Sequence, residues 1–258
     1  MNEQSLKIIG PTIGSLKKPV RLILFTSDVG CESCPEVRKI AQAIKANAPR
    51  VAVESYDLVM DRDKTELYGI KRAPALVVQD SDDHIVTFYG LVEDTFFSIL
   101  LDCILAFSEK RAWFPADVRS TLSHLGQDVH IQVFVETDCP LCRPVAETAI
   151  GLAQENSLIT TDIIIASDYP DLLRKYDIKV LPKTIFGKNL HMDGHVTESE
   201  FLEMIFAAEG LQPNKDRHCI VCSNPSEDII CTNCKTRIQS EALNHKIREE
   251  RSRSISSS

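Results

Sequence analysis

Apolar runs separated by polar segments mark out the first part of the chain as alternating strands and helices. Runs rich in β-branched and aromatic residues predict strands. These strands cover residues 20–25, 51–56, 75–79 and 85–88. Apolar residues at helical spacing predict a helix over residues 37–48 with one buried face, a short polar helix is expected over 61–68, and a closing helix over 93–109. This order predicts an α/β sandwich whose first two strands are parallel and whose last two are antiparallel.

The same order of elements returns in the second part of the chain. Strands are predicted over residues 129–135, 158–165, 184–186 and 191–193. Helices are predicted over residues 116–125, 145–154, 170–176 and 197–208. Residues 5–17 fit either a short helix or a lead-in to the first strand. The chain is therefore expected to hold two α/β units in tandem.

Short motifs repeat together with the elements. A Cys-x-x-Cys motif occupies residues 31–34, and a second one occupies residues 139–142, an offset of 108 residues. Pro74 and Pro182 lie at the same offset, so the spacing from motif to proline is identical in both halves. Repetition at a fixed period indicates duplicated structural units.

Each motif follows a predicted strand and precedes a predicted helix. The free N–H groups and partial positive charge of a helix N-terminus favour a thiolate at the first cysteine, and the thiolate is the nucleophile. The second cysteine lies close enough to attack a mixed disulfide and release the partner. This layout predicts reversible dithiol chemistry at Cys139 and Cys142 and at Cys31 and Cys34. Cys-x-x-Cys also binds metals, so a metal knuckle is one alternative. A decayed site and a purely structural unit are the other two.

The charged residues near each motif predict which of the two forms a thiolate more readily. Arg143 is a cation next to the second motif and favours a thiolate there, while Asp138 opposes it weakly if solvated. Glu32 and Glu36 bring negative charge to the first motif and are expected to raise the pKa of its thiol. The second motif is therefore predicted to be the dominant one.

Length, charge and cysteine usage narrow the class of protein. A chain of 258 residues with 43% apolar residues suggests about two globular domains. The net charge of −8 argues against a general nucleic-acid-binding protein. No signal peptide is evident at the N-terminus, and the longest apolar stretch, residues 96–107, is too short to span a membrane. Eight of the nine cysteines form Cys-x-x-Cys pairs, which is typical of a cytoplasmic protein with redox and metal motifs.

The last two pairs lie beyond the repeats, at Cys219 and Cys222 and at Cys231 and Cys234. Four thiolates in a short, proline-containing segment satisfy tetrahedral zinc and leave no open position, which predicts a structural zinc ribbon. Iron is the rival metal, and a thiol relay is the third possibility. Cys103 lies in an apolar helix and is expected to be a small buried side chain.

These observations predict four segments along the chain. Residues 1–112 and 113–212 form the two repeated units, residues 213–240 form the zinc-ribbon-like segment, and residues 241–258 form a polar tail that we expect to be disordered.

With both motifs and both prolines in place, residues 5–210 resemble the protein disulfide oxidoreductases built from two fused thioredoxin-like, or glutaredoxin-like, units. The resemblance implies two tandem thioredoxin-like folds, each a mixed sheet flanked by helices, with Cys31 and Cys139 attacking and Cys34 and Cys142 resolving. The four C-terminal cysteines depart from this family.

The resemblance also implies a cis peptide before Pro74 and before Pro182, each facing its own cysteine motif. Since proline has no N–H to donate, the backbone of Ala73 or Leu181 could pair with an extended substrate strand that lies across the cysteines.

The sequence thus predicts a thiol–disulfide oxidoreductase that acts on disulfide-containing proteins or small molecules and binds no organic cofactor. The family resemblance makes a thioredoxin-reductase-like flavoprotein the expected electron source. Nucleic acid and membrane are not expected partners. Two other classes stay open: a redox-inert adaptor that binds proteins, and an electron-transfer protein with iron at the C-terminal cysteines.

Overall fold

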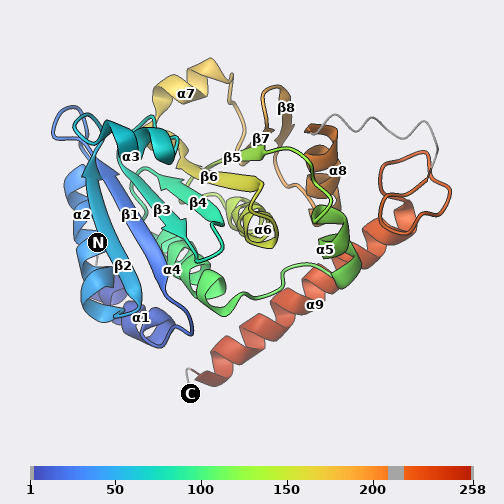
Figure 1. Cartoon of the computed structure of the whole chain (residues 1–258), viewed down its shortest axis with the longest axis horizontal. Coiled ribbons are helices and arrows are strands. Elements are labelled where there is room, and N and C mark those ends of the chain that lie inside the picture. Colours follow the sequence, from blue (N-terminus) through green and yellow to red (C-terminus); the bar gives the residue numbers. More distant parts are fainter. Residues whose placement is uncertain (1–2, 209–217, 257–258) are drawn as a thin grey trace.

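The computed structural model describes residues 3–208 and 218–256, and the first repeat occupies residues 3–112. Its elements follow the predicted order, with a helix in place of the ambiguous N-terminal lead-in (Figure 1). They are α1 (Glu3–Ile13), β1 (Val20–Thr26), α2 (Cys34–Asn47), β2 (Val51–Asp57), α3 (Arg62–Leu67), β3 (Ala75–Gln79), β4 (Ile85–Tyr89) and α4 (Asp94–Glu109). β1 pairs with β2 in parallel, while β3 is antiparallel to both β1 and β4, as the sequence predicted.

The second repeat has the same topology. Its elements are α5 (Ala116–Leu122), β5 (Val129–Val135), α6 (Cys142–Glu155), β6 (Ile159–Ile165), the 3-10 turn η1 (Ala166–Asp168), α7 (Pro170–Lys175), β7 (Lys183–Phe186), β8 (Leu190–Asp193) and α8 (Glu198–Ala208). β5 pairs with β6 in parallel and with β7 in antiparallel orientation. The duplicated motif thus corresponds to a duplicated fold.

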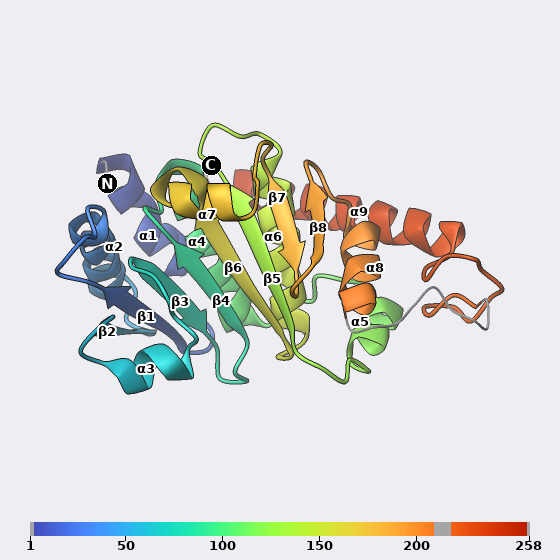
Figure 2. The same cartoon turned by 90° about the horizontal axis from the view of Figure 1, so that it is seen from above.

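The two units share one sheet. Its strand order among the described residues is β2-β1-β3-β4-β6-β5-β7-β8, because β4 of the first unit pairs in parallel with β6 of the second. The pairing runs from Ile85 opposite Thr160 to Tyr89 opposite Ile164. Figure 2 shows the strands as a continuous twisted layer. β2 and β8 are left as its outer edges, so the units are joined head to tail.

The inner strands, such as β1 and β3, are buried on both faces of the sheet. Along β1, Leu22 and Leu24 point into the larger core under α2, α4, α6 and α8, while Ile23 and Phe25 point into a smaller, aromatic-rich core on the side of α3 and α7 (Figure 2). This alternation is the period-2 pattern of a strand. It explains why β1 and β3 read as continuous apolar runs in the sequence.

The C-terminal segment ends in a long helix, α9 (Thr232–Ser256), coloured red in Figure 1. The prediction of a disordered tail is wrong for residues 241–256, which continue this helix. Its first turns are held against α8, where Lys235 Nζ lies 2.8 Å from Glu203 Oε1 and Ile238 is fully buried. Residues 235–256 contain neither glycine nor proline, so nothing in the sequence ends a helix once it has started. The predicted boundary near residue 212 and the last two residues of the tail lie outside the described residues.

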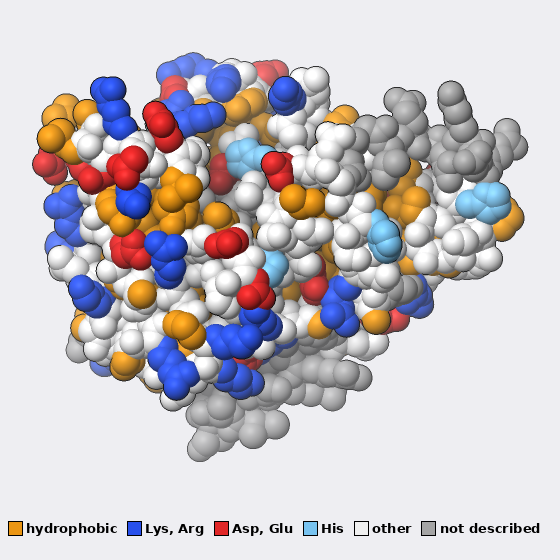
Figure 3. Space-filling view, viewed as in Figure 1, with side chains coloured by type: hydrophobic (Ala, Val, Ile, Leu, Met, Phe, Trp, Pro, Cys, Tyr) orange, Lys and Arg blue, Asp and Glu red, His pale blue; other side chains and the backbone are white. Residues whose placement is uncertain are grey.

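Charges of both signs are mixed on the surface. On the face shown in Figure 3, Lys and Arg side chains lie among Asp and Glu side chains over the first unit. In the described part of the chain, no helix is both long enough and apolar enough to cross a membrane.

Candidate active sites and a candidate metal centre

Each Cys-x-x-Cys motif lies at the junction of a central strand and the helix that follows it. Cys34 begins α2 and Cys142 begins α6, so both motifs sit at helix N-termini. Both pairs form disulfides, with Cα–Cα distances of 5.4 Å for Cys31–Cys34 and 5.3 Å for Cys139–Cys142. The arrangement predicted from the sequence is therefore present twice.

The two cysteines of a pair differ in exposure. Cys31 and Cys139 are partly exposed, whereas Cys34 is 3% exposed and Cys142 is fully buried. In the first motif the backbone N–H of Ser27 also donates to Cys34 Sγ over 3.4 Å. An external partner can therefore reach the first sulfur of each pair, while the second is shielded beneath it.

Two of the charges near the motifs, Arg143 and Glu36, are already paired with other side chains. Arg143 Nε donates to Glu147 Oε1 over 2.8 Å, and its Nη2 lies 3.2 Å from Asp102 Oδ2 on α4. At the first motif, the hydrogen bond from Lys39 Nζ holds the pKa of the Glu36 carboxyl below its usual range. These two charges are thus largely compensated and contribute little to the ranking of the two motifs.

The peptide bonds before Pro74 and Pro182 are both cis, as the family resemblance implied. Each proline precedes the strand that starts the antiparallel half of its unit. The carbonyl of Pro74 accepts the Gly90 N–H over 3.1 Å, and the carbonyl of Pro182 accepts the Gly194 N–H over 2.7 Å. Both glycines have positive φ, +96° and +76°, a region that favours residues without a Cβ. Gly90 and Gly194 are therefore equivalent positions in the two units.

The four C-terminal cysteines come together as predicted. The sulfur atoms of Cys219, Cys222, Cys231 and Cys234 all lie within 4.8 Å of one another, and Cys219 and Cys234 are buried. The Cys222 and Cys231 sulfurs are 3.7 Å apart. Zinc–sulfur bonds of about 2.3 Å at tetrahedral angles place sulfurs about 3.8 Å apart, so this spacing fits a tetrahedral metal.

The cluster stabilises negative sulfur at Cys219, whereas burial and the neighbouring thiols raise the pKa of Cys234 to about 12. Burial raises the pKa of the Cys219 thiol, but donation from the backbone N–H groups of Cys231, Cys222 and Val221 outweighs burial and lowers the pKa to about 7. Thiolates are the form in which cysteine binds metal. The donor set therefore fits a metal held by four cysteines, and it leaves no ligand position for a substrate.

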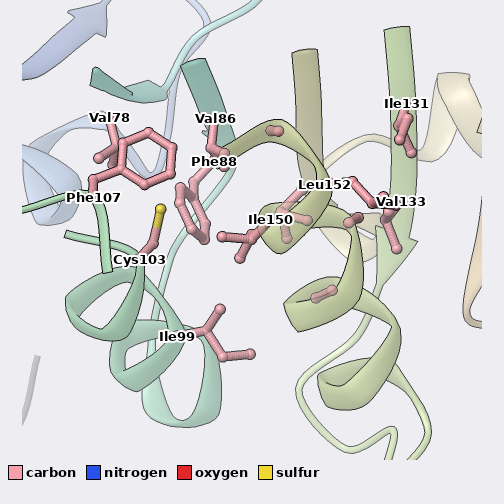
Figure 4. Close-up of a cluster of buried hydrophobic side chains, with 14 of the residues drawn as sticks. Val78, Val86, Phe88, Ile99, Cys103, Phe107, Ile131, Val133, Ile150 and Leu152 are labelled. Carbon is pink, nitrogen blue, oxygen red and sulfur yellow. The ribbon is translucent and has the colours of Figure 1, made fainter. Parts of the chain in front are cut away.

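Cys103 belongs to none of these sites. It is 1% exposed on α4, and Figure 4 shows its sulfur among Val78, Phe88 and Phe107. Burial raises the pKa of this thiol well above the ordinary value, so the nucleophilic thiolate is disfavoured. This confirms the expectation of a small buried side chain.

We therefore expect Cys103 to react with iodoacetamide at least about a hundredfold more slowly in the folded protein than in urea. Mass spectrometry of the Cys103 peptide after timed alkylation measures both rates. Equal rates in the two conditions would contradict its burial.

Asp168 and Tyr169 were missed by the sequence reasoning. They belong to the second unit but contact the first Cys-x-x-Cys site, as detailed below. One signal in the sequence is that residues 166–169 differ from the residues 108 positions earlier in the first repeat. The segment that corresponds to residues 166–169 is Leu58–Asp61, in which Val59 and Met60 are exposed.

The fold and the paired cysteines define a protein of two tandem thioredoxin-like units with a four-cysteine segment at its C-terminal side. Comparison of the sequence with protein families identifies residues 129–207, in the second unit, as a match to the family described as thioredoxin domain. No curated protein matches the sequence.

Solved structures share the tandem fold. A protein disulfide oxidoreductase from Aeropyrum pernix K1 aligns with a TM-score of 0.72 and 24% identity, over 81% of this chain and 94% of that one. The NTD_N/C domain of alkylhydroperoxide reductase AhpF from Enterococcus faecalis V583 aligns with a TM-score of 0.71 and 19% identity, over 80% and 99%. Sso1120 from Sulfolobus solfataricus aligns with a TM-score of 0.56 and 18% identity, over 73% and 99%.

Proposed function

We propose that this chain is a dithiol–disulfide oxidoreductase that exchanges disulfides with protein and small-molecule partners. The observation that carries the proposal is the structure of each motif: two cysteines at disulfide distance, at a helix N-terminus, with the first cysteine partly exposed and the second buried. The tandem thioredoxin-like fold supports it. The cysteines carry the electrons themselves, so no organic cofactor is required.

The exchange proceeds in two balanced steps. The Cys139 thiolate attacks one sulfur of the substrate disulfide, forms a mixed disulfide and releases the other substrate sulfur as a thiolate. The Cys142 thiolate then attacks Cys139 Sγ and releases the second substrate thiolate. Two electrons pass to the substrate, and Cys139 and Cys142 end as a disulfide. Cys31 and Cys34 take the corresponding roles at the first site.

The cis-prolines supply a surface for the substrate backbone. Pro74 and Pro182 are assigned to face their own cysteine pairs, and the peptide groups of Ala73 and Leu181 to pair with an extended substrate segment. A thioredoxin-reductase-like flavoprotein is the proposed electron source.

The remaining features fit a cytoplasmic protein with a structural metal. Reversible pairs and a metal-binding cysteine set are typical of a reducing compartment. Zinc is assigned to Cys219, Cys222, Cys231 and Cys234, since a four-thiolate site without an open position is the common structural zinc site. Iron in its place would give a coloured protein.

Reduction of insulin by dithiothreitol tests the proposed function. The wild-type chain is expected to accelerate the reaction, measured as the turbidity of the released B chain. The variant with Cys31, Cys34, Cys139 and Cys142 all replaced by serine is the control and is expected to react at the rate of dithiothreitol alone. A wild type no faster than this control would refute the oxidoreductase and favour the redox-inert adaptor.

A further inference from the structure

A segment of the second unit lies on the first redox site. Asp168 Oδ2 accepts the backbone N–H of Leu91 over 2.7 Å and the hydroxyl of Ser33, between Cys31 and Cys34, over 3.4 Å. The Tyr169 hydroxyl donates to the carbonyl of Pro74 over 3.1 Å. Residues 167–171, here called the cover segment, thus contact the cysteine motif, the cis-proline and the turn after β4.

The cover segment is fixed at both ends. Tyr169 is 6% exposed, and its ring packs edge-on against Tyr89. Asp171 Oδ2 lies 2.7 Å from Arg72 Nη2 of the first unit. On the other side, the backbone N–H of Ser167 donates to Glu136 over 3.0 Å. These contacts, added to the β4–β6 pairing, make the cover segment part of the folded junction.

The second site lacks this cover within the described residues. A Cβ added at Gly90 would lie 2.8 Å from Asp168 Oδ2, whereas a Cβ added at the equivalent Gly194 would meet no atom within 4 Å. Leu141, the counterpart of Ser33, is 47% exposed. The turn at Gly194, which bonds to Pro182, therefore faces open space, and the equivalent turn at Gly90 is filled by Asp168.

The head-to-tail pairing of the two units explains why the two redox sites differ in their cover. Asp168 follows β6, which pairs with the first unit. Its counterpart in the first repeat, Met60, follows the outer strand β2 and is 83% exposed. The same connection is thus free in one unit and inserted against a redox site in the other.

A substrate can reach Cys31 from another side, through a hollow in the surface. A hollow of about 290 Å³ adjoins both cysteines of the first pair and is lined by Ser27, Asp28, Cys31, Cys34, Pro35, Arg38, Lys39 and Gln42. Its volume is close to that of small-molecule pockets. Both of its cations are paired with carboxylates, since Arg38 lies 3.8 Å from Asp28 and Lys39 lies 2.6 Å from Glu36, so the hollow carries no excess charge of either sign.

We infer that the first site is specific for small disulfides, and that polypeptide disulfides react at the second site. This inference rests on the proposed function. The Cys31 thiolate attacks one sulfur of the small disulfide and releases the other as a thiolate. Cys34 then attacks Cys31 Sγ and releases the second thiolate, and the pair is oxidised as two electrons leave.

Single-turnover reactions of two variants test the specificity. Cys139→Ser/Cys142→Ser keeps only the first site, and Cys31→Ser/Cys34→Ser keeps only the second. Each is reduced, freed of reductant and mixed with insulin, dithiodipropionate or cystamine, and the loss of protein thiols is followed. The first site is expected to oxidise about a hundredfold more slowly with insulin than the second, because the substrate strand cannot align. With dithiodipropionate the two variants are expected to react at similar rates.

The outcomes separate the parts of the inference. Equal rates of the two variants with insulin would overturn the closed groove. A first site that reacts with dithiodipropionate and cystamine as slowly as with insulin would overturn its specificity for small disulfides. If neither variant reacts with any disulfide, the proposed function fails, and access to Cys31 is then decided by alkylation alone.

Alkylation measures access to Cys31 and does so whether or not the protein has redox activity. In the reduced protein, Cys31 is expected to react readily with N-ethylmaleimide but slowly with a maleimide that carries a polyethylene glycol chain, while Cys139 accepts both. Asp168→Ala is expected to raise the rate of the bulky reagent at Cys31 several-fold. Met60→Ala, at the matched position of the first repeat, is the control and is expected to change nothing. Equal access of the bulky reagent to Cys31 and Cys139 in the wild type would refute the cover.

Discussion

Replacing Cys139 by serine is expected to lower the rate of insulin reduction by at least about a hundredfold, because it removes the attacking sulfur and a serine hydroxyl is not ionised near neutral pH. Cys31→Ser is expected to keep most of the activity. The difference follows from access: the turn after β4 beside the first pair is covered by Asp168, while the equivalent Gly194 faces open space. Dithiothreitol-driven insulin reduction measures both variants.

A third variant tests the division of roles within the second pair. Cys142→Ser keeps the exposed nucleophile but lacks the sulfur that resolves the mixed disulfide. It is expected to accumulate a covalent adduct of Cys139 with an insulin chain, visible by mass spectrometry without reductant. Equal loss of activity in Cys139→Ser and Cys31→Ser would instead mean that electrons pass between the two pairs, and it would contradict the ranking of the sites.

The units and their sites could be predicted because their signals are local or periodic. The alternating faces of β1, the helix that starts at each second cysteine and the matched spacing to Pro74 and Pro182 are all present in the sequence. The cis peptides came from the family resemblance. None of these features depends on how one unit packs against the other.

The joint between the units depends on long-range pairing and was not predicted. A signal exists in retrospect. β6 is buried along almost its whole length, whereas β2, at the same place in the first unit, carries the exposed Ser55 and the half-buried Glu54 and Asp57. An inner strand must be apolar on both faces, but an outer strand is kept polar to prevent unwanted pairing. The cover segment follows from this joint, so it was missed as well.

The electrostatic ranking from the sequence failed for a related reason. Arg143 was assigned to the Cys139 thiolate because the two residues are close in sequence. In the folded chain its guanidinium pairs with Asp102 on α4 and with Glu147, one helical turn onward. A charge four residues from a cysteine acts on it only if no better partner lies nearby, and the helices that supply those partners come from both units. The preference for the second site now rests on steric access.

Metal removal is expected to unfold the C-terminal segment while both thioredoxin-like units stay folded. The segment around the four cysteines buries few side chains of its own, among them Ile230 and Ile238, which are both fully buried. Binding of structural zinc by four cysteines contributes on the order of 10 kcal/mol in small zinc domains, far more than so short a segment gains from apolar burial. Treatment with a strong chelator should therefore abolish hydrogen-exchange protection in residues 218–240 and leave the protection of β1 and β5 unchanged.

Cys234→Ser should produce the same loss without a chelator, since three thiolates bind the ion more weakly than four. Cys103→Ser is the matched control, because it also removes a buried thiol but touches no metal ligand, and it should retain one equivalent of metal by elemental analysis. Insulin reduction should stay within about twofold of the wild type in all three cases if the metal is structural.

Protection of residues 218–240 that persists in a metal-free protein would contradict the metal assignment, because the segment would then fold on its own contacts. Loss of insulin reduction together with the metal would instead show that the four cysteines take part in electron transfer, a role that zinc excludes because it has no redox chemistry.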